Sequence, residues 1–547
     1  MAWGDQLVLE WLAPLSLWIL LNGVDDLFVD CARLGLWLWE LRRPAAPPPL
    51  EREPRAALLI PCWREADVIE QMLERNLAAL RYENYDIWLG LYPNDPESIE
   101  RVRRCAARHP RVRYVVGPRP GPTTKADCLN QAIEGVLAHE ERSGEYYELF
   151  LQHDAEDVIH PLALEQAARW TRTYDMVQLP VFAWPTPLRD WTHGVYCDDF
   201  ADVHQRELPV RWRLGGFVPS AGVGTALRRE AVDQLRISYG RQVFDPSSLT
   251  EDYFLGLRLR QLGFSQAFAF ERGQDGRPIA TRAYFPQTLR SAIRQRTRWT
   301  IGNVLQSWER FGWRRGQLYW LWRDRKGLFN NPAALAANAV FCWGAWSWLR
   351  DAAHGQPWAL GAAISGRTGL EEALAATAAL LVWRQGARIW WSGRLYGWRF
   401  AAAAPLRAVW ANGLNVAAAA RAGLIFCGAK LRRRPLHWSK TQHAYPQEAP
   451  GGGAREPRLD PRAAALVRWE QAQRVGATPW RLEGETLVLA QPAPPTLAAE
   501  RQARKLLRRA NLRLVQVSEV QMAALRRQHR ELGGGPLAPS ASLRESS

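Results

Sequence analysis

Five short polar motifs follow one another in a fixed order, and this order constrains the chain more than its composition does. Across about two hundred of the 547 residues they are Asn94-Asp95, Lys125-Ala126-Asp127, His153-Asp154-Ala155-Glu156-Asp157, Thr250-Glu251-Asp252 and Gln295-Arg296-Thr297-Arg298-Trp299. Any one of them has an ordinary explanation, because exposed charges are usually solvated and a Thr before acidic residues often starts a helix. The complete series is better explained by one functional site.

The segments between the motifs alternate between strand and helix patterns. Residues 67–80 have helical spacing, and buried parallel strands are predicted by the short apolar runs at 56–60, 87–91, 112–116 and 147–151. This alternation predicts an α/β domain with a doubly wound, mostly parallel sheet. Such sheets bind ligands beyond the carboxyl ends of their strands. Glu65, Asp95 and Asp154 each follow one of these runs closely, so we expect a site at that edge.

The composition narrows the class of ligand. A formal net charge of +16 fits nucleic acid, an anionic membrane face or a phosphorylated substrate. The Arg residues are spread over the whole chain and we find no nucleic-acid module, so no nucleic-acid partner is expected. The seven cysteines form no CxxC pair, which argues against a zinc module and a disulfide framework.

The acidic motifs suggest metal binding and catalysis. Asp154 and Glu156 stand two residues apart at a predicted strand end, where two carboxylates can share one hard divalent cation. Asp157 is an alternative second ligand, and an acidic turn without function is the ordinary explanation. Asp252 is the strongest catalytic candidate. The motif around it is also typical of a helix start capped by Thr250, and such a cap would hold Asp252 in place.

In their order, these motifs resemble those of the processive family 2 glycosyltransferases, the group that contains cellulose and hyaluronan synthases. The resemblance implies a nucleotide-diphospho-sugar transferase domain of the GT-A fold. It also implies an inverting reaction in which Asp252, with Glu251 beside it, deprotonates the acceptor hydroxyl, and a Mg²⁺ or Mn²⁺ cofactor held by Asp154 and Glu156. The family has the sequence Asp-x-Asp at the metal-binding position, whereas this chain has Glu156 in place of the second Asp.

The same resemblance implies the remaining roles. Arg298 would pair with the donor diphosphate, and Trp299 would stack on the acceptor sugar. The implied donor-binding residues are Glu65, Asp95, Lys125, Asp127, Asp154, Gln295, Arg296 and Arg298, and the implied acceptor-binding residues are Trp299, Gly222 and Gly224.

Apolar segments flank the motif region. Residues 7–24 lack a basic n-region and a cleavage site, so they predict an uncleaved membrane anchor. Asp25, Asp26 and Asp30 follow, and we expect them at the membrane interface or against another helix, because carboxylates are costly in hydrocarbon. The positive-inside rule places the N-terminus outside and the bulk of the chain in the cytosol.

Three later apolar segments differ in kind. Residues 333–349 and 373–391 predict two more spans. Residues 401–427 contain Arg407 and Arg421 and predict an amphipathic helix on the cytosolic face. Three spans in total also return the basic residues 432–434 to the cytosol.

The C-terminal part predicts a small α+β domain. Its order is helix, a strand pair (480–482 and 486–490), helix, strand (512–517) and helix. This order resembles the N-terminal module of type II secretion ATPases (MshEN-like), whose relatives bind cyclic di-GMP. The nucleotide-binding signature of those relatives, an RLG start followed by paired Leu and Gly positions, is absent. Two interpretations of this domain therefore remain: it binds cyclic di-GMP, or it is an apolar docking module without a ligand.

The predicted domains follow from these segments. They are an anchor (1–43), a Pro-rich linker (44–55), the glycosyltransferase domain (56–328), transmembrane and interfacial helices (329–448), a linker (449–458), the MshEN-like domain (459–532) and a disordered tail (533–547). This layout resembles bacterial inner-membrane proteins of the bacteriophage adsorption protein B type. That resemblance implies synthesis of a surface glycan with an outer-membrane export partner. The alternatives are a single-sugar transferase acting on a lipid carrier and a catalytically silent receptor or scaffold that senses a nucleotide.

Overall fold

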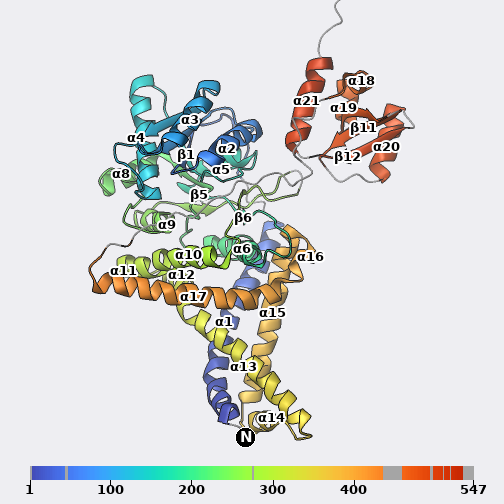
Figure 1. Ribbon diagram of the computed structural model, residues 1–547. Helices are drawn as coiled ribbons and strands as arrows, with labels where there is room; N and C mark the ends of the chain where they lie inside the picture. The colour runs from blue at the N-terminus through green and yellow to red at the C-terminus, as the bar shows by residue number, and fades with distance from the viewer. Residues whose placement is uncertain are drawn as a thin grey trace, which may run out of the picture. The chain divides into compact units, whose positions relative to one another are not determined.

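The computed structural model describes residues 3–42, 47–273, 276–434, 436, 459–483, 485–492, 497–508, 511–517 and 519–533. It divides into two compact units, Met1–Pro446 and Gln447–Ser547, which are coloured from blue to orange and in red in Figure 1. The linker predicted at 449–458 and residues 534–547 of the predicted tail lie outside the described residues, as do residues 44–46 of the Pro-rich linker.

A mixed sheet forms the centre of the first unit. Among the described residues it has seven strands in the order β3-β2-β1-β4-β7-β5-β8. Their bounds are β1 (Ala56–Pro61), β2 (Tyr85–Leu91), β3 (Val112–Val116), β4 (Leu149–Gln152), β5 (Met176–Gln178), β7 (Thr225–Arg228) and β8 (Gln266–Phe268). The predicted α/β sheet is confirmed with one difference: β7 runs antiparallel to both β4 and β5. Gly224 N donates to Gln152 O, so β7 begins where β4 ends and must run back beside it.

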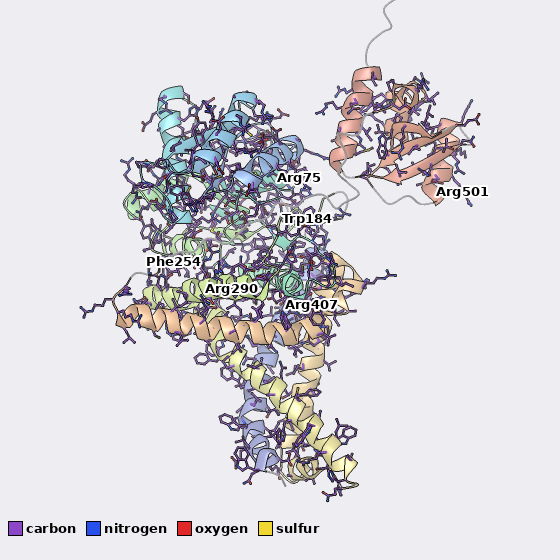
Figure 2. The ribbon with its side chains drawn as sticks, in the orientation of Figure 1. Arg75, Trp184, Phe254, Arg290, Arg407 and Arg501 are labelled. Atoms are coloured by element: carbon purple, nitrogen blue, oxygen red, sulfur yellow. The ribbon has the colours of Figure 1, made fainter. Side chains whose placement is uncertain are left out.

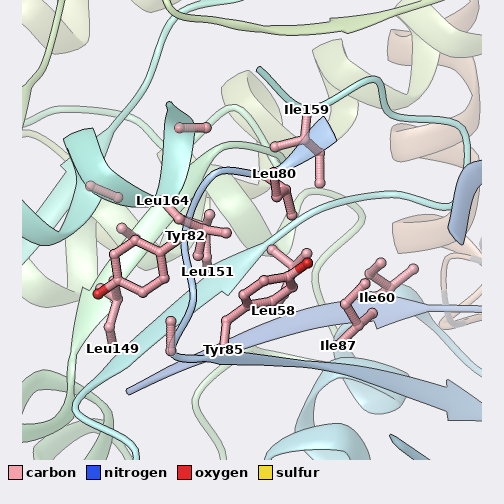
Figure 3. Close-up of a cluster of buried hydrophobic side chains, with 14 of the residues drawn as sticks. Leu58, Ile60, Leu80, Tyr82, Tyr85, Ile87, Leu149, Leu151, Ile159 and Leu164 are labelled. Carbon is pink, nitrogen blue, oxygen red and sulfur yellow. The ribbon is translucent and has the colours of Figure 1, made fainter. Parts of the chain in front are cut away.

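Helices cover both faces of this sheet. They are α2 (Ala66–Ala79), α3 (Pro96–Arg108), α4 (Lys125–Ser143), α5 (Ala163–Thr171), α8 (Arg229–Ser238) and α9 (Glu251–Gln261). Leu58 and Ile60 of β1 pack against α2, α3 and α5, as Figure 3 shows in part, whereas Ala57 and Leu59 pack against α4, α8 and α9. Burying each large apolar side chain stabilises the fold by about 1.5–3 kcal/mol. The strand ends are therefore a rigid support for the residues that follow them.

A second group of helices lies below the sheet. They are α6 (Trp191–Asp202), the π-helix η1 (Val203–Glu207), α7 (Leu208–Arg213), α10 (Leu289–Trp299), the π-helix η2 (Thr300–Gln306), α11 (Ser307–Phe311), α12 (Leu318–Arg325), α16 (Trp398–Ala401) and α17 (Ala404–Leu431). β6 (Val181–Ala183) and β9 (Thr281–Ala283) form a separate parallel pair.

Three long helices run together away from the sheet (Figure 1). These are α1 (Trp3–Glu40), α13 (Gly327–Ala353) and α15 (Leu370–Tyr396), with the short α14 (Ala359–Ser365) between the last two. α1 packs against both α13 and α15. Each of the three predicted spans falls within one of these helices.

The helix α17 lies differently. It packs against α13 and α15 and also against α6 and α10 (Figure 1). Its Arg407, labelled in Figure 2, is 1% exposed and forms two hydrogen bonds of 2.7 and 2.9 Å with the Asp198 carboxylate of α6. Leu406, Val409 and Leu424 on the same helix are exposed. The interfacial position expected for 401–427 stays a prediction.

Hydropathy favours different helices as membrane spans than packing does. Among the described residues, two helices are long and apolar enough to cross a membrane by length and composition, namely α1 and α17, with mean hydropathies of 1.6 and 1.3. The helices α13 and α15 do not meet that measure. Composition thus favours α17 as a span and packing favours α13 and α15, so the number of spans stays a prediction.

The aspartates of α1 lie against other helices, one of the two placements expected for them. Asp25 pairs with Arg323 and Lys326, each at 2.5 Å. Asp30 pairs with Arg206 at 3.1 Å. These ion pairs join α1 to the helices below the sheet.

The second unit has the predicted order of elements, except that two short helices stand where one was expected before the strand pair. The elements are α18 (Pro461–Ala465), α19 (Trp469–Val475), β10 (Thr478–Glu483), β11 (Thr486–Gln491), α20 (Leu497–Leu507), β12 (Leu512–Gln516) and α21 (Glu519–Gly533). Within the described part, β10 and β11 are antiparallel and β11 and β12 are parallel. Leu487, Leu489 and Leu512 share a buried core with residues of α18, α19 and α20.

Candidate active site

A cavity of about 110 Å³ lies at the carboxyl end of β4, below the sheet. The starts of α4 and α9 and the end of α10 border it. Its lining residues are Lys125, Asp154, Glu156, Asp157, Val181, Phe200, Ala221, Val223, Leu249, Thr250, Glu251, Asp252, Ala283, Tyr284, Phe285, Gln295, Arg298 and Trp299. Residues from four of the five sequence motifs therefore meet in one place.

The acidic turn after β4 is held by its own last residue. Asp157 Oδ2 accepts from the backbone N of Asp154 and lies 2.9 Å from His153 Nδ1. Both side chains are fully buried, and burial raises the pKa of Asp157. Since Asp157 is engaged within the turn, Asp154 and Glu156 are the better placed pair for a cation.

Lys125 joins this turn to the Gly-rich turn before β7. It is the first residue of α4, where the Thr124 side chain accepts from Asp127 N and caps the helix. Its Nζ lies 2.6 Å from Asp154 Oδ1 and donates to Gly222 O at 2.9 Å. Burial acts to lower the pKa of the Lys125 ammonium, but the charges of Asp154 and Glu251 outweigh it and keep the pKa above its ordinary value. Lys125 is therefore a fixed cation in the cavity.

Two adjacent carboxyl groups begin α9. Burial, and then the charge of Asp252, raise the pKa of Glu251 to about 7, and burial also raises the pKa of Asp252. Asp252 Oδ1 accepts from Tyr253 N at 2.7 Å, which orients the carboxylate. A carboxylate with a raised pKa, aimed into a cavity beside a lysine, can accept a proton from an entering hydroxyl group.

Thr250 does not act as the expected cap. It occupies the N-cap position of α9, but within the described residues its hydroxyl makes no hydrogen bond. Instead the side chain packs on Gly302 of η2, where an added Cβ would lie 2.1 Å from Thr250 Oγ1. Gln306, also on η2, accepts from Leu249 N at 3.0 Å. The start of α9 is thus positioned by the helix that follows the Gln-x-x-Arg-Trp motif.

Gln178 at the end of β5 is a positioning residue that the sequence did not reveal. It is fully buried; its amide nitrogen donates to Val223 O and its amide oxygen accepts from Ala221 N. The turn it holds has positive φ at Gly222 (78°) and Gly224 (63°). A Cβ on Gly222 would lie 2.6 Å from Asp252 Oδ2, so this position requires glycine. A lone Gln at a strand end carries no recognisable signal.

The side chains of the fifth motif point in two directions, some into the cavity and one away from it. Gln295, Arg298 and Trp299 of α10 line the cavity. Arg296 instead bonds to Asp199 of α6 and to Asn415 of α17, each at 2.7 Å. Trp299 lies among Tyr196, Phe200 and Phe285, aromatic residues that sequence reasoning did not select.

Five other expected site residues do not line the cavity; one of them is Gly222, in the turn beside Lys125 and Asp252. Asp95 caps α3 and accepts from Arg64 N at 2.6 Å. Glu65 is buried near it, and its backbone N donates to Ser98 Oγ. Asp127 accepts from Arg119, Thr123 and Gln131 and stabilises the loop before α4. Gly224 lies against Thr281 and Leu179. Asp95 and Glu65 do lie at the carboxyl edge of the sheet, where a donor larger than this cavity would extend.

The carboxylates of the cavity suit a cation whose remaining ligands come from the substrate. Among the described residues no three His, Cys, Asp or Glu side chains are grouped to hold a metal ion. Asp154 and Glu156 supply two carboxylates, and Mg²⁺ is commonly bound by one or two carboxylates together with substrate phosphates. These residues therefore fit a Mg²⁺ or Mn²⁺ ion bound with a diphosphate, and not a centre made by protein side chains alone.

Comparison with known proteins gives the family of this region. Residues 54–302 match the family model described as glycosyltransferase like family 2. The chain carries a family 2 glycosyltransferase domain. Its mixed sheet and acidic turn form a GT-A-like fold. Residues 453–535 match the MshEN domain model, so the predicted resemblance of the C-terminal unit is confirmed.

Similarity to curated proteins extends beyond that domain. Bacteriophage adsorption protein B of Escherichia coli K12 and bacteriophage N4 adsorption protein B of Escherichia coli O157:H7 are each 34% identical over 466 residues, 79% of this chain. The chain spans 61% of the length of these relatives. A solved mannosyltransferase from Pyrobaculum calidifontis, in complex with GDP-mannose and Mn²⁺, matches with a TM-score of 0.42 and 17% identity, covering 73% of this chain and 99% of that one.

Proposed function

We propose that this protein is an inverting, metal-dependent membrane glycosyltransferase that transfers a sugar from a nucleotide-diphosphate donor to a growing surface glycan. The observation that carries the proposal is the meeting of Lys125, Asp154, Asp252 and Arg298 in one cavity of a family 2 domain. A receptor or scaffold needs no such combination of a buried base and fixed cations.

The roles follow from charge and position. Asp252 takes the proton of the acceptor hydroxyl, whose oxygen attacks the anomeric carbon of the donor from the face opposite the diphosphate. Lys125 and Arg298 hold the diphosphate as negative charge develops on it. A divalent cation held by Asp154 and Glu156 supplies further neutralisation of that leaving group. Trp299 and Phe285 offer aromatic faces against which the acceptor sugar can lie.

The test is donor turnover by purified, detergent-solubilised protein. UDP- and GDP-sugars are supplied with Mg²⁺ or Mn²⁺, and Asp252→Asn is compared with Glu230→Gln. Glu230 is an exposed carboxylate on α8 that pairs with Arg228 at the end of β7, outside the cavity. Turnover of one donor by wild type and the control, but not by Asp252→Asn, is expected. Equal turnover by Asp252→Asn would show that the base is assigned wrongly.

Product length separates the two enzymatic alternatives. A polymeric product in the turnover assay supports glycan synthesis, whereas a lipid carrier that has gained one sugar identifies a single-sugar transferase. The curated relatives are named for bacteriophage adsorption. We extend this to a surface glycan used by phages and exported through an outer-membrane partner, and loss of phage binding in an Asp252→Asn strain tests it.

The proposed location is the bacterial inner membrane, with the catalytic domain facing the cytosol. α1, α13 and α15 span the membrane and α17 lies at its surface. Support comes from the packing of the three long helices and from the ion pairs that gather where they meet the catalytic domain. A cysteine at Trp3 should react with a membrane-impermeant maleimide from outside intact inner-membrane spheroplasts; no reaction there would invert the topology.

The MshEN domain is proposed as a regulatory module, with cyclic di-GMP as the ligand to test. Saturable binding to the full chain, measured by calorimetry, would support this role. Absence of binding would favour the docking module without a ligand.

A further inference from the structure

A second cavity, of about 500 Å³, lies between α1 and α15. Its lining is mostly apolar: Asp30, Cys31, Arg33, Leu34, Trp37, Trp383, Gly386, Ala387, Trp390, Trp391 and Arg394. Trp37, Trp383 and Trp390 are 45%, 54% and 50% exposed. None of these lining residues borders the active-site cavity. We call this feature the α1–α15 groove.

One part of the α1–α15 groove is basic, because both Arg33 and Arg394 line it. The positive charge of Arg394 also acts on Arg272, which lies outside the lining. Glu40 pairs with Arg33 at 3.4 Å. In the part of the chain that the structure describes, no carboxylate pairs with Arg394 or Arg272. Asp30, the acidic residue of the lining, is already paired with Arg206.

The groove is connected to the catalytic domain through η1. Arg33 Nε donates to Gln205 O at 2.9 Å. The Gln205 side chain donates in turn to Ala201 O of α6 and to Trp391 O of α15, each at 3.0 Å. Phe200, the neighbour of Ala201, lines the active-site cavity. A ligand that fixes Arg33 and Trp391 would therefore also fix α6.

We propose that the α1–α15 groove binds a glycerophospholipid with a net negative headgroup, its acyl chains along the tryptophans and its phosphate between Arg33 and Arg394. This inference rests on the membrane location proposed above. Tryptophan rings prefer the level of the headgroups, and basic side chains at that level attract anionic lipids. A lipid-linked acceptor fits less well, because a headgroup held in this groove is not in the cavity that contains Asp252.

The experiment measures lipid retention on the full chain by native mass spectrometry. Detergent-solubilised protein is titrated with phosphatidylglycerol, with phosphatidylcholine of the same acyl chains or with a polyprenyl phosphate. We expect preferential retention of phosphatidylglycerol, weakened about five-fold by Arg394→Gln, with phosphatidylcholine unchanged. Arg394 is exposed, so this variant should fold; Arg394→Glu should weaken retention further. Arg399→Gln is the matched control, because Arg399 is exposed nearby and does not line the groove.

Three outcomes would overturn the inference: equal retention of the two lipids, retention that Arg394→Gln leaves unchanged, or preferential retention of a polyprenyl phosphate that then becomes glycosylated. Retention is read without any reaction. Selective retention in a preparation that turns over no donor would therefore count against the proposed function and support the lipid site, whereas turnover without lipid selectivity would do the reverse.

Discussion

The turn after β4 and the start of α9 both present carboxylates to the same cavity, but they are held in different ways. In the turn, Asp157 bonds to Asp154 N and His153, so five consecutive residues fix their own geometry. At the start of α9 the expected local cap is missing. Thr250 packs on Gly302, and Leu249 is held by Gln306, more than fifty residues away.

This difference separates two tasks. A turn that binds a cation needs only a few carboxylates near one another, and a short segment can supply that. A base must instead be placed against an acceptor that other elements hold. Linking α9 to η2, which continues α10, places Asp252 in a constant position relative to Arg298 and Trp299. We therefore expect local changes to affect the turn and distant changes to affect the base.

The largest effect should come from Asp252→Asn. Removing the general base lowers transfer by about 10²–10⁴-fold, while the isosteric amide preserves the shape of the site. Single-turnover rates with the identified donor measure the loss, and circular dichroism verifies folding. A loss below tenfold would mean that another group takes the proton.

Gly302→Ala should break the distant support of that base. The new Cβ would collide with Thr250 Oγ1, and displacing a reacting group by about 1 Å can cost about a hundred-fold in kcat. Donor KM should change little, because the acidic turn is untouched. Adding Thr250→Ala relieves most of the collision and should restore part of kcat; no recovery would exclude this contact as the cause.

Asp157→Ala should disturb the local support instead. It leaves Asp154 N and His153 buried without their acceptor, which costs about 1–3 kcal/mol of unfolding free energy. Urea unfolding of the full chain measures this, with the partly exposed Asp233→Ala on α8 as the control. An unchanged unfolding midpoint would show that the turn is held by other contacts.

The smallest effect concerns pH. A base acts only when deprotonated. Because burial raises the pKa of Asp252, activity should be full at higher pH and should be lost as the pH falls through that raised pKa. Glu251→Gln removes the neighbouring charge and should move the acid limb of kcat to lower pH. If the acid limb does not move, the charge of Glu251 does not influence the pKa of the base.

Much of the fold follows from local pattern. The runs at 56–60 and 87–91 lie within β1 and β2 because continuous apolar residues between polar turns fit a strand buried on both faces. The run at 112–116 forms β3 at the edge of the sheet, where Val112 is buried and Tyr114 and Val116 are exposed. The antiparallel β7 was not predicted. Its direction depends on where the Gly222–Gly224 turn meets Gln152, a contact between segments about seventy residues apart.

The site shows the same division. The two arginines of the fifth motif stand two positions apart in the sequence, and the family resemblance gave both to the donor. Packing sends Arg298 into the cavity and Arg296 to Asp199 and Asn415, because side chains two apart on a helix face different sides. Asp127 likewise serves its own loop.

Residue types in a fixed order determined the resemblance of residues 54–302 to family 2 glycosyltransferases, the α/β class and the acidic and basic groups of the cavity, since such chemistry depends on single residues and short spacings. Only the tertiary structure decided which of them meet, that Gln178 holds the glycine turn, and that η2 positions Asp252. The reason is physical: a side chain's identity sets what it can bind, whereas its neighbours depend on long-range packing that no local pattern encodes.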